Sequence, residues 1–333
     1  MKKHVVNTPF TSNRTHPQNL NKKDNHLFSH EYSKIFKGDH YLILNKVTVV
    51  NEFILSLKYW NLLTKYIYFY KPTYSKIFKD IYKNLTRNSK SSKKISLGIW
   101  ITDNKSSVYF HWLCDALTRY LILPKEYKNV PVLLPEKYDI PWTVEFLNFM
   151  NIKYKIIKKG QKVKVKTLIV PSHTAPSGNF NKKVLNELRR ILLQKADVRE
   201  DSGQNHKKIW VSMEKHRRPI KNMPELRKTL IKYGFEEVIF EDLTLLHKIK
   251  LLNETKVIAG SHSSGLTNMI FMRKNSKVLD IRDPEDNVKN AFFTLSSELN
   301  LKYYYMEREK RSDKDIIINP KKLEKVFKAM DIK

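Results

Sequence analysis

Short apolar runs rich in β-branched residues alternate with helix-period segments through the last part of the chain. The pattern predicts strands at residues 209–212, 238–240, 257–259, 278–281 and 303–306. It predicts helices at residues 224–233, 243–253, 266–272, 288–299 and near 320–330. Strands that alternate with helices of about ten residues indicate a parallel, doubly wound sheet that is covered on both faces. We therefore predict an α/β fold whose ligands bind at the carboxyl ends of the strands.

The first half of the chain shows a similar alternation. It predicts strands at 95–101, 130–134 and 167–170, helices at 111–123, 142–150 and 181–195, an aromatic-rich helical region at 41–90 and a loop at 84–94. A length of 333 residues suits two domains. We predict a polar, loosely ordered arm at 1–40, a domain at 41–196, a polar linker at 197–207 and a second domain at 208–333. The last helix can pack on either domain in this scheme.

The composition excludes wholesale disorder, and the charge narrows the choice of partners. Apolar residues make up 41% of the chain, which is enough for a sizeable core. Lys and Arg outnumber Asp and Glu by 63 to 33, a formal net charge of +30. Two explanations stay open, a coding bias towards Lys and an attraction to an anionic membrane surface. The aromatic, Lys-interrupted segment 53–70 fits either an amphipathic helix packed on the body or an interfacial membrane contact.

Cysteine content and hydropathy favour a location in a reducing compartment. The one cysteine, Cys114, excludes an internal disulfide and a cysteine-based zinc site, and it fits a reducing environment. No apolar region follows the N-terminus, and no run of about 18 uncharged apolar residues occurs. We therefore expect neither a signal peptide nor a spanning helix. The expected location is the cytoplasm, with peripheral contact to the inner face of the cytoplasmic membrane as an option.

A loop of small residues, Gly260 to Gly265, follows one predicted strand and opens a helix. Small residues let the backbone approach a ligand closely, and a helix N-terminus offers free N–H groups to a phosphate. The loop is neither a dinucleotide-binding fingerprint nor a Walker A loop. A tight turn with an ordinary cap is the structural alternative. His262, inside this loop, is either a structural hydrogen-bonding residue or a contact for a sugar or phosphate.

Several cations gather at the end of the first predicted strand of the second domain. Arg217 and Arg218 are two of the chain's few arginines, and this favours anion recognition over a generic solvated surface. Asn222 follows, with Glu225 three residues later. This spacing predicts a capping box at the start of the next helix.

The first half contributes a polar stripe on a helix. His111, Asp115 and Arg119 are spaced four residues apart, so they lie on one face, bordered by apolar residues such as Trp112. One interpretation is an ion-paired helix surface. The other is a catalytic group, because a His or Asp held in a cleft can act as general base on a hydroxyl.

Together these three elements resemble glycosyltransferase family 61 in their order and spacing. The first matching motif is the helix with His111, Asp115, Leu117 and Arg119. The second contains Arg218, Ile220, Asn222, Glu225 and Leu226, and the third is the loop from Gly260 to Asn268. The resemblance covers about residues 95 to 306. The chain departs from it at Ser263 and Ser264, where the family has Gly-Ala, and at Met213, where the family tends to have Arg.

The resemblance implies a GT-B enzyme, in which two Rossmann-like domains face each other across a cleft. It implies an inverting transfer from a nucleotide-sugar, expected to be a UDP-sugar, to a hydroxyl of a glycan or lipid-linked acceptor. Surface polysaccharide biosynthesis, of capsule or lipopolysaccharide, is the expected setting. The resemblance implies no cofactor and no essential metal, so cations and helix dipoles would offset the diphosphate charge.

The resemblance also assigns residues to the two substrates. The expected donor-binding residues are Arg217, Arg218, Asn222, Glu241, Gly260, His262, Ser264, Gly265, Leu266, Thr267, Asn268 and Asp280. Arg218, with help from Arg217, would offset the diphosphate, and amides from Gly265 to Asn268 would cradle it. Asn222 would shape its loop, and Glu241 or Asp280 would meet ribose or sugar hydroxyls.

The expected catalytic residues lie on the polar helix. Asp115 or His111 would be the base, with Arg119 orienting it. Asp115 is slightly preferred on the sequence alone, because a carboxylate is already ionised at neutral pH.

Two rival functions stay open. A nucleic-acid-binding protein would explain the charge and the isoelectric point near 9.9. However, the basic residues are spread along the chain, and no helix-turn-helix, zinc-finger or RNA-recognition signature is present. A catalytically inactive scaffold with a glycosyltransferase fold is the second rival, which the departures at Met213, Ser263 and Ser264 would permit.

Overall fold

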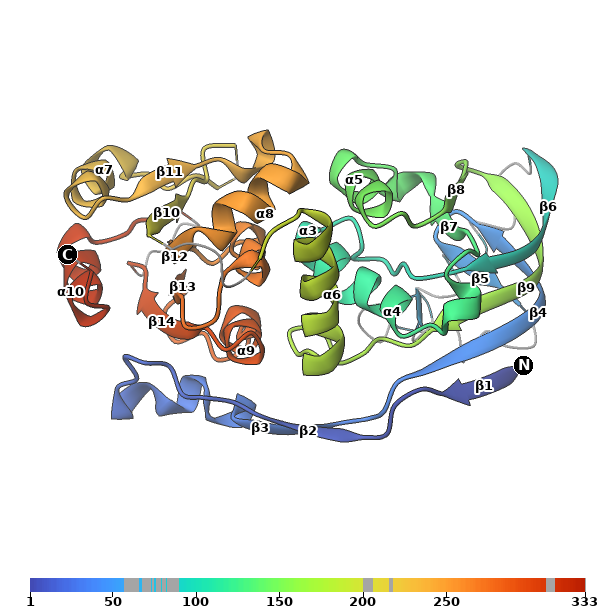
Figure 1. Cartoon of the computed structure of the whole chain (residues 1–333), viewed down its shortest axis with the longest axis horizontal. Helices are drawn as coiled ribbons and strands as arrows, with labels where there is room; N and C mark the ends of the chain where they lie inside the picture. The colour runs from blue at the N-terminus through green and yellow to red at the C-terminus, as the bar shows by residue number, and fades with distance from the viewer. Residues whose placement is uncertain are drawn as a thin grey trace. The chain divides into compact units, whose positions relative to one another are not determined.

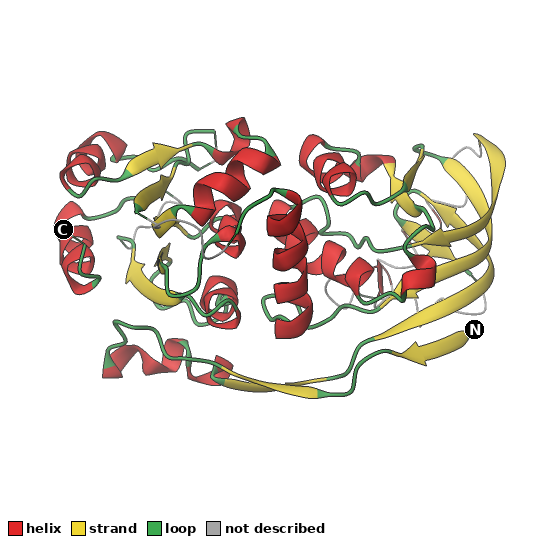
Figure 2. Cartoon of the chain, viewed as in Figure 1, coloured by secondary structure: helices red, strands yellow, loops and turns green. Residues whose placement is uncertain are grey.

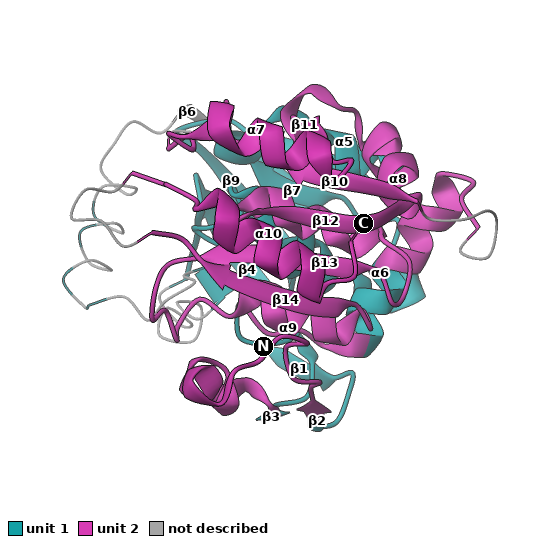
Figure 3. Ribbon diagram, turned by 90° about the vertical axis from the view of Figure 1, so that its left-hand side faces the viewer, with its two compact units in different colours: residues 1–10, 35–177, 183–188 teal, residues 11–34, 178–182, 189–333 magenta. Residues whose placement is uncertain are grey.

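The computed structural model describes residues 1–56, 66–67, 73, 75, 79, 82, 90–199, 206–215, 218–309 and 315–332. The chain divides into two units (Figure 3). Unit 1 comprises Met1–Phe10, Ile35–Ser177 and Lys183–Leu188, and unit 2 comprises Thr11–Lys34, Gly178–Lys182 and Arg189–Lys333. The division therefore falls within α6 (Lys182–Lys195). It does not fall in the predicted linker 197–207, of which residues 200–205 lie outside the described part.

Unit 1 is built on a seven-stranded mixed sheet (Figures 1 and 2). Its parallel part has the order β9-β6-β7-β8, formed by β6 (Lys90–Ile99), β7 (Val132–Pro135), β8 (Tyr154–Ile157) and β9 (Gln161–Pro171). On the other side of β9, β4 (His40–Val50) runs antiparallel to it. Two short strands, β1 (Lys2–Val5) and β5 (Phe53–Leu55), pair antiparallel with β4. The first domain is thus α/β, but its sheet is not the purely parallel one expected.

Two sequence predictions in unit 1 are wrong. The beginning of the 41–90 region is strand and not helix. β4 pairs with β9 along most of its length, and Val47 and Val49 of β4, with Ile54 of β5, are buried in the core. The predicted loop at 84–94 contains the start of β6. The predicted helix at 142–150 is confirmed as α5 (Pro141–Phe149), which lies on one side of the sheet (Figure 1).

Unit 2 contains the parallel sheet that the alternation predicts. Its order is β11-β10-β12-β13-β14, with β10 (Lys207–Val211), β11 (Glu236–Val238), β12 (Thr255–Ser261), β13 (Lys277–Arg282) and β14 (Lys302–Glu307). Helices α7 (Met223–Lys232), α8 (Leu245–Asn253) and α9 (Ala291–Glu298) connect strands of this sheet, and α10 (Pro320–Ala329) follows the last strand. Leu323 and Phe327 of α10 join the core around Trp210. The last helix therefore packs on unit 2.

Residues 1–40 are not the loose arm that their polarity predicts. Residues 11–34, the N-terminal strap, fold onto unit 2, and β2 (Phe10–Asn13) pairs with β3 (Ser33–Phe36). The Asn19 side chain binds the backbone N–H and C=O of Tyr305 and so covers the edge of β14. Phe28 is buried against Phe293 and Tyr303. Polar residues can be buried here because distant parts of the chain supply their hydrogen bonds.

No helix among the described residues has the length and apolar character needed to cross a bilayer. The segment 53–70, singled out by the sequence, lies outside the described residues from residue 57 onwards, except for Tyr66 and Ile67. Both of these are buried in the core of unit 1.

Strand order gives each unit a topological switch point, the place where consecutive connections leave in opposite directions. In unit 1 it lies between β6 and β9, because the chain continues from β6 through β7 to β8 and then returns to the other side of β6. In unit 2 it lies between β10 and β12. The crevice beyond the carboxyl ends of such strands is where open α/β sheets bind ligands.

Candidate functional site

The helix after β6 carries the first candidate cluster. It consists of α3 (Tyr109–His111), the π-helical turn η3 (Trp112–Ala116) and α4 (Leu117–Leu121). A single π turn inside a helix is frequent at functional sites. His111 Nδ1 lies 2.7 Å from Asp115 Oδ2, and their side chains are 17% and 4% exposed. Because a carboxylate accepts hydrogen bonds, Nδ1 donates here, and Nε2 is the unprotonated nitrogen of the neutral ring.

Ser177 belongs to the same cluster, although the sequence did not single it out. It lies in the loop after β9, and its hydroxyl donates to Asp115 Oδ2 at 3.1 Å. Asp115 therefore accepts from both His111 and Ser177 through one oxygen. The carboxylate is thus fixed in place, and the loop after β9 is tied to the helix after β6.

Arg119 has a different role from the one predicted. Its guanidinium is fully buried and donates to the backbone oxygens of Pro171 and Tyr66, at 3.0 and 3.2 Å. Burial lowers its pKa to about 10, although the nearby charges of Asp103, Tyr66 and Asp115 act in the other direction. Arg119 anchors the end of β9 instead of orienting the base by a direct hydrogen bond.

A second His–Asp pair lies at the switch point of unit 1. Asp103 follows β6, His173 follows the neighbouring β9, and His173 Nε2 lies 2.8 Å from Asp103 Oδ2. The other oxygen of Asp103 accepts from the Lys105 amide and the Ser106 hydroxyl. Burial raises the pKa of Asp103, but the hydrogen bond and charge of His173, with Arg119 and the Lys105 amide, bring it down to about 2. The carboxylate therefore stays ionised.

This pKa predicts a specific acid dependence of stability. An Asp103 pKa of about 2 in the folded chain, against 3.8 for the ordinary group, stabilises the fold above pH 3.8 and is lost as pH falls through 2. The difference in unfolding free energy between wild type and Asp103→Asn should therefore shrink by about 2 kcal/mol between neutral and strongly acid pH. Urea unfolding at a series of pH values measures it. A difference that stays constant with pH would contradict the assignment.

Close packing explains the glycines of the candidate loop in unit 2. A Cβ atom at Gly260 would lie 2.9 Å from Val211 Cβ, and one at Gly265 would lie 2.5 Å from Val211 Cγ1. The loop therefore passes directly against the end of β10 at the switch point. His262, Ser263, Ser264 and Gly265 are half-buried and reach the surface.

The helix that follows is the 3-10 helix η7 (Ser264–Phe271), so the predicted cradle from Gly265 to Asn268 has to be corrected. Leu266, Thr267 and Asn268 are all buried. The Leu266 amide already donates to the Ser263 oxygen, and the Asn268 side chain donates to the Gly265 oxygen. These buried residues support the loop through hydrogen bonds to its backbone. The accessible part of the turn is Ser263 to Gly265.

His262 is held by a buried network. Its Nδ1 lies 2.9 Å from Asp280 Oδ2, which also accepts from the Tyr303 hydroxyl at 2.9 Å. Asp280 is fully buried within β13, so the predicted contact with a ribose or sugar hydroxyl does not fit its position. Burial and the charge of Asp280 raise the pKa of Tyr303 far above its usual value, which keeps the phenol protonated and donating. Asp280 thus orients His262.

The cationic loop after β10 is fixed differently from the predicted capping box. The Asn222 side chain makes no capping bond to α7, and its closest approach to Glu225 is 3.5 Å. Its amide instead pairs with both backbone groups of Ile318. Arg218 and Glu241 are exposed, whereas Met213 is buried in the core. Arg217 lies outside the described residues.

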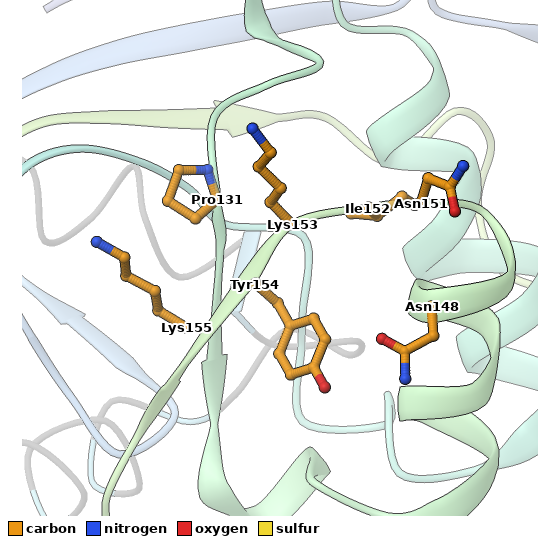
Figure 4. Close-up of a pocket in the computed structure, with 7 residues that line it drawn as sticks. All are labelled: Pro131, Asn148, Asn151, Ile152, Lys153, Tyr154 and Lys155. Carbon is orange, nitrogen blue, oxygen red and sulfur yellow. The ribbon is translucent and has the colours of Figure 1, made fainter.

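A separate hollow of about 620 Å³ opens at the edge of unit 1 (Figure 4). Its lining residues are Pro131, Asn148, Asn151, Ile152, Lys153, Tyr154 and Lys155. None of the residues of either His–Asp pair of unit 1 lines it. Within the described ranges, no three His, Cys, Asp or Glu side chains gather as metal ligands would.

A comparison with protein families covers both candidate regions. Residues 109–279 match the model of a family described as Glycosyltransferase 61. The match is slightly longer than half the chain. It begins at the first residue of α3 and ends in β13, so it includes the His111–Asp115 pair and the loop from Gly260 to Gly265. No curated protein matches the chain.

Proposed function

Because the chain belongs to the glycosyltransferase 61 family, we propose that it transfers a sugar from a UDP-sugar to a hydroxyl of a glycan or lipid-linked acceptor, with inversion. Membership indicates a glycosyltransferase, and the donor, the stereochemistry and a place in surface polysaccharide synthesis are parts of the proposal. Unit 2 would bind the donor and unit 1 the acceptor, as the two halves of a GT-B enzyme. The supporting observation is that each unit holds an imidazole tied to a buried carboxylate after a strand of its switch point, His111 with Asp115 in unit 1 and His262 with Asp280 in unit 2.

The geometry favours His111 over Asp115 as the base, which reverses the preference drawn from the sequence. The Asp115 side chain is 4% exposed and accepts two hydrogen bonds through one oxygen, whereas the His111 side chain is 17% exposed. In the proposed step, His111 Nε2 takes the proton of the acceptor hydroxyl. The oxygen forms a bond to the anomeric carbon, and the bond from that carbon to the diphosphate breaks. Asp115 stabilises the imidazolium that forms.

The donor side would use the accessible part of unit 2. Ser264 and Gly265 stand at the start of η7, where amide groups lack partners inside the helix and favour an anion. Arg218 would offset diphosphate charge, and Glu241 would meet a sugar or ribose hydroxyl. His262, held by Asp280, would face the leaving group. These assignments need no metal ion and no cofactor.

Nucleotide binding tests the proposal and gives a prediction for Arg218. UDP, compared with GDP and CMP in a thermal-shift assay, should raise the melting temperature, and the shift should survive EDTA. Arg218→Ala should weaken UDP binding about tenfold or more, because a charge-assisted hydrogen bond to phosphate is lost. Arg190→Ala, an exposed arginine on α6, is the matched control and should bind normally. Equal UDP affinity in Arg218→Ala and wild type would remove Arg218 from the donor site.

A further inference from the structure

The sheet of unit 1 has an unusual charge distribution. None of its seven strands contains an Asp or Glu, whereas several contain lysine. The sheet of unit 2 differs, because its strands contain Glu236, Glu237, Asp280 and Glu307. The positive charge of the chain is therefore not spread evenly over its sheets.

Four of these lysines gather on one face, the basic face, formed by Lys46, Lys94, Lys164 and Lys166. In the register of β6 and β9, Lys94 lies directly beside Lys164, and Lys166 follows two residues later on the same face. The pairs Asn45–Thr167 and Val47–Val165 place Lys46 of β4 across from Lys166, although a φ of 54° at Lys46 interrupts the regular strand at that residue. Figure 1 shows the three strands side by side. All four lysines are exposed, while the alternate residues of β9, such as Val163 and Val165, are buried.

This arrangement is unfavourable in isolation. Like charges that stand opposite each other on neighbouring strands destabilise a sheet. Strands lie about 4.8 Å apart, and every second residue along a strand repeats after about 6.7 Å, so neighbouring lysines of this face start from closely spaced backbone positions. Within the described part of the chain, no carboxylate forms an ion pair with any of the four. An anionic partner that covers the whole face would offset this repulsion.

We propose that the basic face docks on an anionic lipid surface. A sheet face presents its charges over an area rather than along a groove, which suits a layer of headgroups. Lysine near such a surface contributes as a point charge and needs no fixed geometry. Nucleic acid fits less well, because the four positions contain no arginine for bidentate contacts and no aromatic ring for base stacking. The proposal goes beyond the sugar-transfer function and does not depend on it.

Vesicle sedimentation with the full chain tests this docking. The probes are vesicles of phosphatidylglycerol and phosphatidylcholine in equal parts, and vesicles of phosphatidylcholine alone. The basic-face variant replaces Lys46, Lys94, Lys164 and Lys166 by Glu. The control variant replaces Lys228, Lys250, Lys274 and Lys325 by Glu, four exposed lysines of unit 2, so both variants carry the same net charge. A second basic-face variant with Gln keeps the test open if the Glu variant does not fold.

The wild type should bind only the anionic vesicles, and less at about 1 M salt, where the Debye length falls to about 3 Å. The basic-face variants should bind at least about tenfold more weakly, and the control variant should keep most of the affinity. Three results would overturn the proposal: no binding of the wild type to anionic vesicles, equal losses in basic-face and control variants, or binding to a duplex DNA in preference to the vesicles.

Discussion

Replacing His111 by Gln should slow sugar transfer by about a hundredfold to ten-thousandfold, the usual contribution of a general base. In the proposed step, His111 donates through Nδ1 to Asp115 and takes up the proton of the acceptor hydroxyl on Nε2. Gln preserves polarity at this position but takes up no proton near neutral pH, so the hydroxyl would have to attack without assistance. The measurement is the initial rate of UDP release from a UDP-sugar in the presence of an acceptor. Unchanged melting temperature in the variant would separate lost catalysis from lost folding.

Variants of two neighbouring residues, Asp115 and Ser177, test which side chain acts as the base. Asp115→Asn should also lose a large part of the rate, because it no longer stabilises the imidazolium or fixes its tautomer. Ser177→Ala should lose less, since Asp115 keeps its bond to His111 when the serine hydroxyl is removed. A His111→Gln protein with full rate, beside an inactive Asp115→Asn protein, would instead make Asp115 the base.

Replacing Arg14 by Ala should lower the free energy of unfolding by about 3–5 kcal/mol, the largest stability loss expected in this chain. The Arg14 side chain is fully buried in unit 2. It lies 3.1 Å from a carboxylate oxygen of Glu31 and 3.2 Å from one of Glu298, and it also donates to Asn179. Its removal takes the guanidinium away from two buried carboxylates, of which Glu31 still pairs with Lys34. Urea unfolding followed by circular dichroism measures the loss.

An exposed ion pair of the same unit provides the comparison. Lys232 and Glu324 lie 3.0 Å apart, and Lys232 is largely exposed to water. Lys232→Ala should therefore lower the unfolding free energy by less than about 1 kcal/mol. If Arg14→Ala lost no more than Lys232→Ala, the N-terminal strap would not be an integral part of unit 2.

The strap also shows why parts of the fold were not predictable. Arg14 and Glu298 are separated by 284 residues, and nothing in the sequence around either residue indicates that the two form an ion pair. Polar residues with such distant partners look like a solvated arm when only local pattern is considered. By contrast, β12 and β13 were found because a buried parallel strand is a continuous apolar run, which is visible locally. β4 was missed although Val47 and Val49 alternate, because the aromatic residues that follow suggested a helix.

The candidate site divides in the same way. His111 and Asp115 are four residues apart on a helix, so their contact follows from helix geometry alone. Asp103 and His173 are separated by 70 residues, and only the pairing of β6 with β9 brings them together. Asn222 shows competition between the two levels. Its spacing to Glu225 predicts a local cap. In the structure the Asn222 side chain instead forms hydrogen bonds with the backbone C=O and N–H of Ile318.

The sequence by itself determined the alternating α/β pattern of unit 2, the family, the polar helix and the Gly260–Gly265 loop. The pattern and each motif depend on residues that are close together along the chain. Only the tertiary structure decided that His173 pairs with Asp103 and His262 with Asp280, that Asp280 and Arg119 are buried supports, and that four lysines share one face. Those facts depend on strand order and register. These are set by the packing of whole strands, and no short stretch of sequence contains them.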